Sequence, residues 1–153
     1  MSVQPQGEVH IRSASDIVAM RRTVREVAKA LGFGLTDVTR IVTATSELVR
    51  NVVLYAGSGV MRWRELDMSG NVGLELTLED YGPGIANIEQ AMQEGYTTSG
   101  ALGMGLPGTK RLMDEFEIAS EVGKGTRITV RKWRRPWADG QMMAHAAIRA
   151  LAD

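Results

Sequence analysis

One segment of the chain places a carboxylate, an amide and a phenol at regular intervals. Glu47, Asn51 and Tyr55 are spaced four residues apart, so a helix would bring all three side chains to one face. A carboxylate in that position can take a proton from a hydroxyl group, and an amide oxygen is a hard ligand suited to Mg²⁺. A solvent-exposed polar stripe on an amphipathic helix would give the same pattern.

A second segment, Asp80-Tyr-Gly-Pro-Gly-Ile85, follows an apolar stretch that is typical of a strand. Asp80 would lie at the end of that strand, where its carboxylate could accept a hydrogen bond from an exocyclic amine. Gly82 and Gly84 lack a Cβ atom and would let the backbone approach a ligand closely. An ordinary turn after a strand has the same composition, so this segment alone does not decide between the two interpretations.

A third segment, Gly100-Ala-Leu-Gly-Met-Gly-Leu-Pro-Gly-Thr-Lys110, is rich in glycine and opens a helical pattern. Free N–H groups at a helix start attract an anion such as a phosphate. The order Gly-Thr-Lys departs from the Gly-Lys-Ser/Thr ending of a Walker A loop, and no strand directly precedes the glycines as a Rossmann fingerprint requires. The H-R-D and D-F-G signatures of protein kinases are absent. A flexible loop without a ligand is the alternative.

Hydrophobic periodicity predicts the elements that must position these segments. The expected order is strand, helix, helix, strand, strand, helix, strand, strand, at residues 8–12, 15–31, 37–56, 60–66, 74–79, 107–113, 116–122 and 126–133, with a further short helix possible over 86–94. Because the strands occur in pairs, this order predicts an α+β fold with helices packed on one face of a mixed, largely antiparallel sheet. One domain is expected over 1–133, followed by a helical extension over 134–153.

The composition excludes several classes of protein. The 153 residues include 18 Lys plus Arg, 18 Asp plus Glu and no Cys, so disulfides, zinc–thiolate sites and cysteine nucleophiles are excluded. A net charge of zero argues against a nucleic-acid partner. No apolar stretch approaches the roughly 18 residues of a membrane span, so we expect a soluble, cytoplasmic protein without a membrane partner.

Taken together and in this order, the three segments resemble the conserved boxes of the GHKL (Bergerat-type) ATP-binding fold of histidine kinases, gyrase-type ATPases and anti-sigma-factor kinases. The residues that carry the resemblance are Glu47-Leu-Val-Arg-Asn51, Asp80-Tyr-Gly-Pro-Gly-Ile85, Gly103-Met-Gly105 and Gly125-Thr126. Within that superfamily, the sequence over 8–133 is most similar to the RsbT-type switch kinases of bacterial stress signalling. Tyr55 stands where many members have His.

The resemblance implies a role for each matched residue. Glu47 corresponds to the carboxylate that orients or deprotonates the attacking hydroxyl, and Asn51 to the Mg²⁺ ligand. Asp80 corresponds to the residue that recognises the adenine amine of ATP, and Gly82 and Gly84 give the base room. Residues 95–106 correspond to the ATP lid. The other matched ATP-binding positions are Gly103 and Gly105, whose N–H groups face the phosphates, Thr126 near the adenine, and Lys110 or Arg111 near the phosphates.

The resemblance also implies partners. Kinases of this kind phosphorylate a Ser or Thr of a STAS-domain antagonist, and the RsbT type also binds and activates a phosphatase, which makes a PP2C-type phosphatase or a stressosome scaffold a further expected partner. A non-catalytic anti-sigma or regulatory module that uses the same fold only for partner binding is the alternative. Retention of both Glu47 and Asn51 favours the enzyme. An ATP hydrolase of the gyrase or chaperone kind is disfavoured, because those proteins carry further transducing domains.

Overall fold

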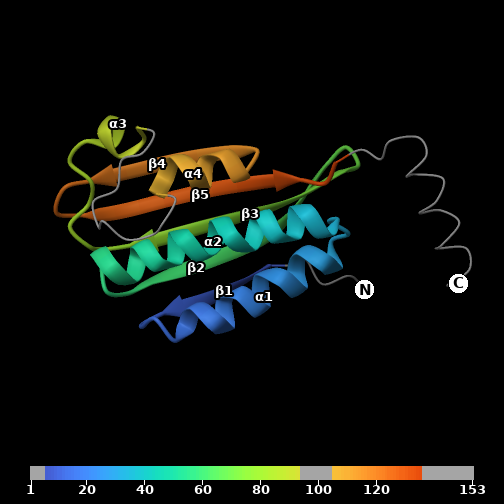
Figure 1. The fold of residues 1–153 in the computed structure, drawn as a ribbon, viewed down its shortest axis with the longest axis horizontal. Coiled ribbons are helices and arrows are strands. Elements are labelled where there is room, and N and C mark those ends of the chain that lie inside the picture. Colours follow the sequence, from blue (N-terminus) through green and yellow to red (C-terminus); the bar gives the residue numbers. More distant parts are fainter. Residues whose placement is uncertain (1–5, 94–104, 136–153) are drawn as a thin grey trace, which may run out of the picture.

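The computed structural model describes residues 6–93 and 105–135, which form a helical layer on one face of a five-stranded sheet (Figure 1). The strand order is β1-β2-β3-β5-β4, and every pairing in this sheet is antiparallel. The elements are β1 (Gln6–Ile11), α1 (Asp16–Ala30), α2 (Leu35–Tyr55), β2 (Gly59–Met68), β3 (Asn71–Asp80), α3 (Ile88–Ala91), α4 (Gly105–Leu112), β4 (Glu115–Glu121) and β5 (Gly125–Trp133). The expected element order and the α+β class are confirmed. The expected extension over 134–153 lies outside the described residues from 136 onward.

The core lies between the sheet and α2, the longest helix of the described chain. On β3, Leu74, Leu76 and Leu78 alternate with polar residues and are all buried, so one face of the strand supplies the floor of the core. On α2, Ile41 and Leu48 recur at helical spacing and are buried above that floor. Leu48 also lines the ligand cavity described below, so burial of this apolar stripe sets how the C-terminal half of α2 faces that cavity.

The opposite face of the sheet is open and carries charges that alternate in sign from strand to strand. The side chains on it are Glu8 on β1, Arg62 and Arg64 on β2, Glu75 and Glu79 on β3, Arg131 on β5, and Glu115 and Glu117 on β4. Arg62 donates to Glu8 and Glu79 over 3.0 and 2.7 Å, and Arg131 donates to Glu75 over 2.8 Å. Each basic strand is thus flanked by two acidic strands, which favours this strand order.

Helix α1 begins one residue after its expected start, and α2 begins at Leu35, two residues before its expected start. Ser15 occupies the N-cap position of α1 but makes no capping hydrogen bond. Instead, Asp16 Oδ2 accepts from the backbone N–H groups of Arg12 and Ser13. Helix α4 begins at Gly105, two residues before the expected start at Pro107. A proline fits this first turn, where its missing N–H would have no partner in the helix.

None of the helices in residues 6–93 and 105–135 is long and apolar enough to cross a membrane.

Candidate functional site

A cavity of about 430 Å³ opens between the C-terminal half of α2 and the end of the sheet. Its walls come from α2, the end of β3, residues 83–87, α3, the start of α4 and the start of β5. Its volume lies within the range of small-molecule and cofactor sites, which is about 300–1,000 Å³. Of the residues expected to form the site, Glu47, Asn51, Asp80, Gly84, Gly105 and Thr126 line it.

The α2 wall of the cavity carries the residues expected to act on phosphate and metal. Glu47 and Asn51 are one helical turn apart and both face the cavity, as their spacing predicts. The Glu47 side chain is only 14% exposed, and Arg50 Nη1 lies 3.4 Å from its Oε1 atom. Tyr55, one turn beyond Asn51, lines the cavity and is 44% exposed. This wall therefore presents a carboxylate, a guanidinium and an amide side by side.

Across the cavity, Asp80 ends β3. Its Oδ1 atom accepts a hydrogen bond of 2.9 Å from the Gly82 backbone N–H, which fixes the carboxylate against the following turn. The structure records no hydrogen bond to Asp80 Oδ2 from residues 6–93 or 105–135. That atom is therefore able to accept a hydrogen bond from an amine of a ligand in the cavity.

The glycines after Asp80 are required by protein packing. A Cβ atom on Gly84, whose φ is +78°, would collide with the backbone of Glu121 in the β4–β5 hairpin. A Cβ atom on Gly82 would lie 2.6 Å from the Cβ of Ala56, and Gly82 is not among the residues that line the cavity. The structure thus assigns both glycines a role in bringing the loop close to its neighbours. Gly84 also contributes to the cavity wall.

Ser120 on β4 contributes to the site although its residue type gave no such indication. Its hydroxyl donates to the Gly125 carbonyl over 3.0 Å, accepts from the Ile85 N–H over 2.8 Å and lies 2.8 Å from Thr126 Oγ1. It thereby joins the loop after Asp80 to the start of β5. The one available signal was its polarity at a position that continues the inward-facing series of Phe116 and Ile118.

The glycine-rich segment is described only from Gly105 onward. Gly105 begins α4, has a φ of +67° and lines the cavity, so it requires the left-handed conformation that glycine adopts readily. Gly103 and residues 95–104 of the expected lid over 95–106 lie outside the described residues. Lys110 and Arg111 are exposed on α4, and neither lines the cavity.

The cavity wall offers oxygen ligands of the kind that Mg²⁺ prefers. The described residues contain no cluster of three or more His, Cys, Asp or Glu side chains that could form a protein-only metal site. Mg²⁺ in nucleotide sites is usually held by one or two protein oxygens together with phosphate and water oxygens. The amide oxygen of Asn51, with the Glu47 carboxylate one turn away, fits that mode of binding.

Comparisons with known proteins agree with this arrangement. Residues 12–132 match the family model of the histidine kinase-like ATPase domain. The chain is 52% identical over 130 residues to the serine/threonine-protein kinase RsbT of Bacillus subtilis, and this alignment covers 85% of this chain and 98% of that protein. It is 33% identical over 138 residues to the anti-sigma F factor of Geobacillus thermodenitrificans, and this alignment covers 83% of this chain and 92% of that protein.

The fold is also found among solved structures. A structure of the RsbU and RsbW domains of a Mycobacterium tuberculosis protein aligns with a TM-score of 0.54 at 23% identity, over 85% of this chain and 33% of that one. A mycobacterial sensor histidine kinase aligns with a TM-score of 0.52 at 18% identity, over 88% of this chain and all of that one. These matches confirm the resemblance to the GHKL kinases, and the RsbT relative supports the expectation of a serine/threonine protein kinase. The chain belongs to the histidine kinase-like ATPase family.

Proposed function

We propose that this chain transfers the γ-phosphoryl group of ATP to a Ser or Thr hydroxyl of a STAS-domain antagonist in a partner-switching pathway. The observation that carries the proposal is that Glu47 and Asn51 line the same cavity as Asp80 and Thr126. A base, a metal ligand and a hydrogen-bond acceptor for adenine therefore surround one ligand-sized space. The kinase and anti-sigma relatives support both the activity and the regulatory setting.

The protein's own residues would bind and orient the reactants. Asp80 Oδ2 would accept a hydrogen bond from the adenine amine, with Thr126 bordering the base and Ser120 Oγ in contact with the Thr126 hydroxyl. The acceptor hydroxyl oxygen would form a bond to the γ-phosphorus as the bond to the β–γ bridging oxygen breaks and ADP leaves. Glu47 would take the hydroxyl proton. Such a transfer depends mainly on positioning and charge neutralisation, so no covalent enzyme intermediate is needed.

Asn51 would hold Mg²⁺ together with phosphate oxygens. When bound, the ion would neutralise charge on the transferring phosphoryl group. Backbone N–H groups around Gly103 and Gly105 would supply further donors to the phosphates. Lys110 and Arg111 lie further along α4 and would reach the phosphates only from the exposed face of that helix.

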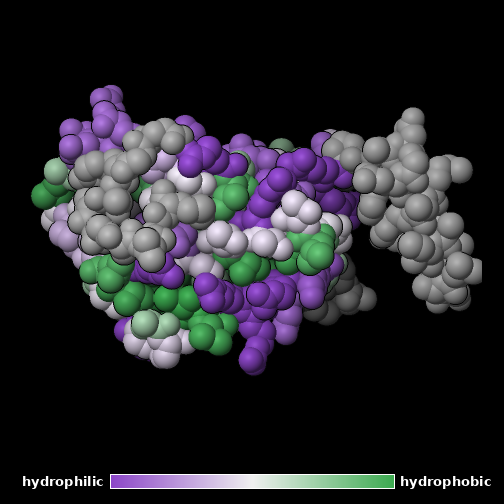
Figure 2. Space-filling model, viewed as in Figure 1, coloured by the Kyte–Doolittle hydropathy of each residue, from purple (hydrophilic) through white to green (hydrophobic). Residues whose placement is uncertain are grey.

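The acceptor hydroxyl would be delivered by a docked protein, because the described chain has no separate substrate lobe. The rim of the cavity suits such docking, since Leu54 and Tyr55 line it and are 54% and 44% exposed. Figure 2 shows hydrophobic residues gathered at the end of the helical layer where α2 ends. An apolar rim beside the reacting groups favours a folded partner over generic peptide substrates.

The test is phosphate transfer from radiolabelled Mg-ATP to a purified STAS-domain protein from the same organism. We expect Glu47→Gln to reduce the transfer rate at least about 100-fold while changing the Kd for Mg-ATP by less than about threefold, because the carboxylate acts on the acceptor rather than on the nucleotide. Asn51→Ala should weaken Mg-ATP binding itself. Glu26→Gln, on the exposed surface of α1, is the matched control.

Two outcomes would contradict the proposal. Equal transfer by the wild type and Glu47→Gln would remove the catalytic role of Glu47. Absence of transfer by a protein that binds both Mg-ATP and the STAS partner would favour the non-catalytic regulatory module. A fully folded Asn51→Ala variant that binds Mg-ATP as tightly as the wild type would remove the metal-ligand role.

A further inference from the structure

Arg50 occupies the cavity wall between the two α2 residues assigned above. Its Nη1 atom lies 3.4 Å from Glu47 Oε1, and it lines the cavity together with Glu47 and Asn51. Its side chain is 40% exposed, whereas that of Glu47 is 14% exposed. A partly solvated guanidinium thus approaches an almost enclosed carboxylate at the point where we place the acceptor hydroxyl.

This ion pair differs from an ordinary surface pair on a helix. Exposed pairs with this spacing contribute about 0.2–0.5 kcal/mol, because both side chains remain free in solvent. An enclosed carboxylate is costly without a charged or hydrogen-bonding partner. Among residues 6–93 and 105–135, the structure records no hydrogen bond or ion pair for the Glu47 carboxylate other than the ion pair with Arg50. The orientation of the carboxylate therefore depends on one guanidinium.

A second carboxylate on the same helix shows what a redundant arrangement looks like. Asp37, near the start of α2, is held by Arg40 at 3.1 Å in the same i, i+3 geometry. It also lies 3.8 Å from Lys132 Nζ and 3.4 Å from Arg135 Nε. Loss of one cation would leave Asp37 with two others, whereas loss of Arg50 would leave Glu47 with none in the described chain.

We propose that Arg50 is a positioning residue for phosphoryl transfer, which holds the Glu47 carboxylate in the orientation needed to accept the acceptor's proton. The inference rests on the function proposed above. Glutamate has three rotatable side-chain bonds, and an unanchored carboxylate would be distributed over several rotamers. Misplacement of a reacting group by about 1 Å can cost about 100-fold in rate. Arg50 therefore acts through Glu47 and makes no bond to the reacting atoms.

The experiment compares Arg50→Met, Arg50→Lys, Glu47→Gln and the double variant Glu47→Gln/Arg50→Met. We expect Arg50→Met to lower kcat for transfer to the STAS partner by about 10- to 100-fold, with KM and Kd for Mg-ATP changed less than about threefold. Arg50→Lys should recover part of the rate, because lysine keeps the positive charge. The recovery should be incomplete, because lysine lacks the planar guanidinium group. In the Glu47→Gln background, Arg50→Met should have no further effect, since the carboxylate that it positions is gone.

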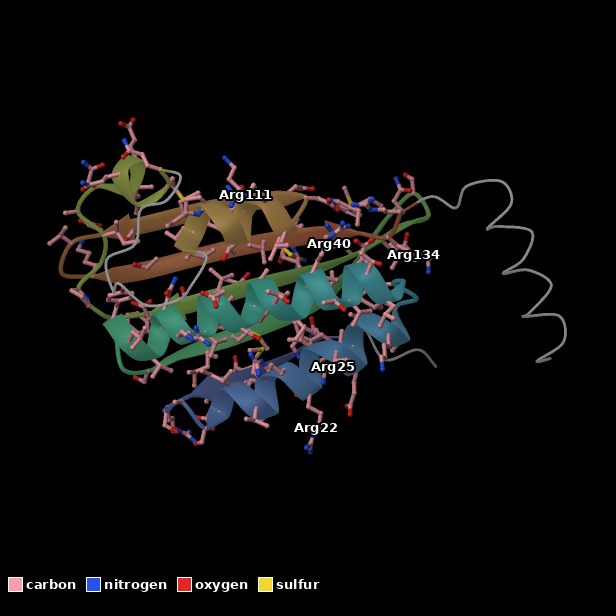
Figure 3. All side chains as sticks on the ribbon, viewed as in Figure 1. Arg22, Arg25, Arg40, Arg111 and Arg134 are labelled. Atoms are coloured by element: carbon pink, nitrogen blue, oxygen red, sulfur yellow. The ribbon has the colours of Figure 1, made fainter. Side chains whose placement is uncertain are left out.

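Arg22→Met is the matched control, because Arg22 is exposed on α1 and extends away from the sheet in Figure 3. Circular dichroism melting of every variant checks that the fold is retained. Normal transfer by Arg50→Met would overturn the inference and leave the proposed function intact. Additive losses of rate in the double variant would also overturn the inference. So would a rise in the Kd of Arg50→Met for Mg-ATP that equals its loss in kcat/KM, because Arg50 would then act on the nucleotide. Wild-type transfer by Glu47→Gln would instead overturn the proposed function.

Discussion

Glu75 is the most constrained acidic side chain on the open face of the sheet. Glu75 is 8% exposed, and its carboxylate accepts hydrogen bonds from Arg64 Nε at 2.7 Å and from Arg131 Nε at 2.8 Å. Hydrogen bonding from Arg64, with a smaller contribution from Arg131, lowers the pKa of the Glu75 carboxyl although burial opposes this shift. The ionised carboxylate thus stabilises the folded protein relative to the unfolded chain.

Substitution Glu75→Gln should lower the free energy of unfolding by about 1–2 kcal/mol at pH 7, because it removes the carboxylate that lies between the Arg64 and Arg131 guanidinium groups. Arg131 keeps Glu115 and Glu117 as partners, whereas Arg64 loses its carboxylate partner. The folded-state pKa is lowered, so this stabilisation is present above the ordinary glutamate pKa of about 4.3 and is lost as pH falls through the folded value. Urea unfolding at pH 7 and pH 3 should therefore show a difference that shrinks at the lower pH. Glu121→Gln, which removes an exposed ion pair with Lys124, is the control. A difference that is independent of pH would contradict this account.

At this scale, helical spacing was sufficient to predict that Glu47 and Asn51 share a face. Periodicity could not predict the burial of Glu75, because alternation along β3 assigns it only to the solvent side of the strand. Its burial arises from arginines on the two neighbouring strands, which a single strand's sequence does not identify. Ser120 was missed for the same reason, since its three contacts come from residues on other segments of the chain.

Three elements are joined by a buried lysine at the end of the molecule where α2 begins. Lys132 on β5 is 2% exposed, and its Nζ atom donates to the Leu112 carbonyl at the C-terminus of α4 over 2.8 Å. The same atom lies 3.5 Å from Asp114 and 3.8 Å from Asp37 on α2. Figure 3 labels Arg40 and Arg134 near this end. Lys132 therefore satisfies an otherwise unpaired helix carbonyl and two carboxylates.

Substitution Lys132→Met should lower the free energy of unfolding by about 1–3 kcal/mol, because it leaves the Leu112 carbonyl without its donor and Asp114 without its cation. Asp37 keeps Arg40 and Arg135. Chemical denaturation measures this loss, and Lys124→Met on the exposed β4–β5 turn should change stability by less than about 0.5 kcal/mol. Because Lys132 anchors the C-terminus of α4 to β5, hydrogen exchange of the α4 amides should also increase in Lys132→Met. Unchanged stability with a folded Lys132→Met protein would show that α4 is held by its apolar contacts alone.

The type and order of the elements could be predicted from apolar spacing and turn residues. Ser69 and Gly70 both have positive φ, as a two-residue turn between β2 and β3 requires. Helix boundaries are less accurate, because α2 and α4 each begin two residues before the start that apolar spacing predicts. The start of α4 was displaced because a proline two residues into a helix is tolerated there.

At the scale of the whole molecule, equal numbers of basic and acidic residues give a net charge of zero, and many of these residues are paired in a regular pattern on the sheet. Acidic and basic strands alternate across the open sheet face, so many of the acidic residues are paired within that face. The sequence predicted a sheet of paired strands, but the position of β5 between β3 and β4 could not be derived from it. That order depends on β3 meeting β5, whose partner residues lie about 50 positions apart in the chain. The cavity lies at the opposite end of α2 from the point at which the described chain ends.

The C-terminal extension should be dispensable for nucleotide binding. Arg135 pairs with Asp37 at the start of α2, and at about 1.5 Å per residue this point is roughly 20 Å along the helix axis from Asn51. The described cavity lining comes from residues between Glu47 and Ile128. We therefore expect deletion of residues 137–153 to change the Kd for Mg-ATP by less than about threefold, measured by titration calorimetry. Trp137, Met142, Met143, Ile148 and Leu151 lie outside the described residues, and their apolar spacing in the sequence predicts that the deletion alters self-association or partner binding instead. A large loss of Mg-ATP affinity in a truncated protein with an unchanged circular dichroism spectrum would show that the extension completes the nucleotide site.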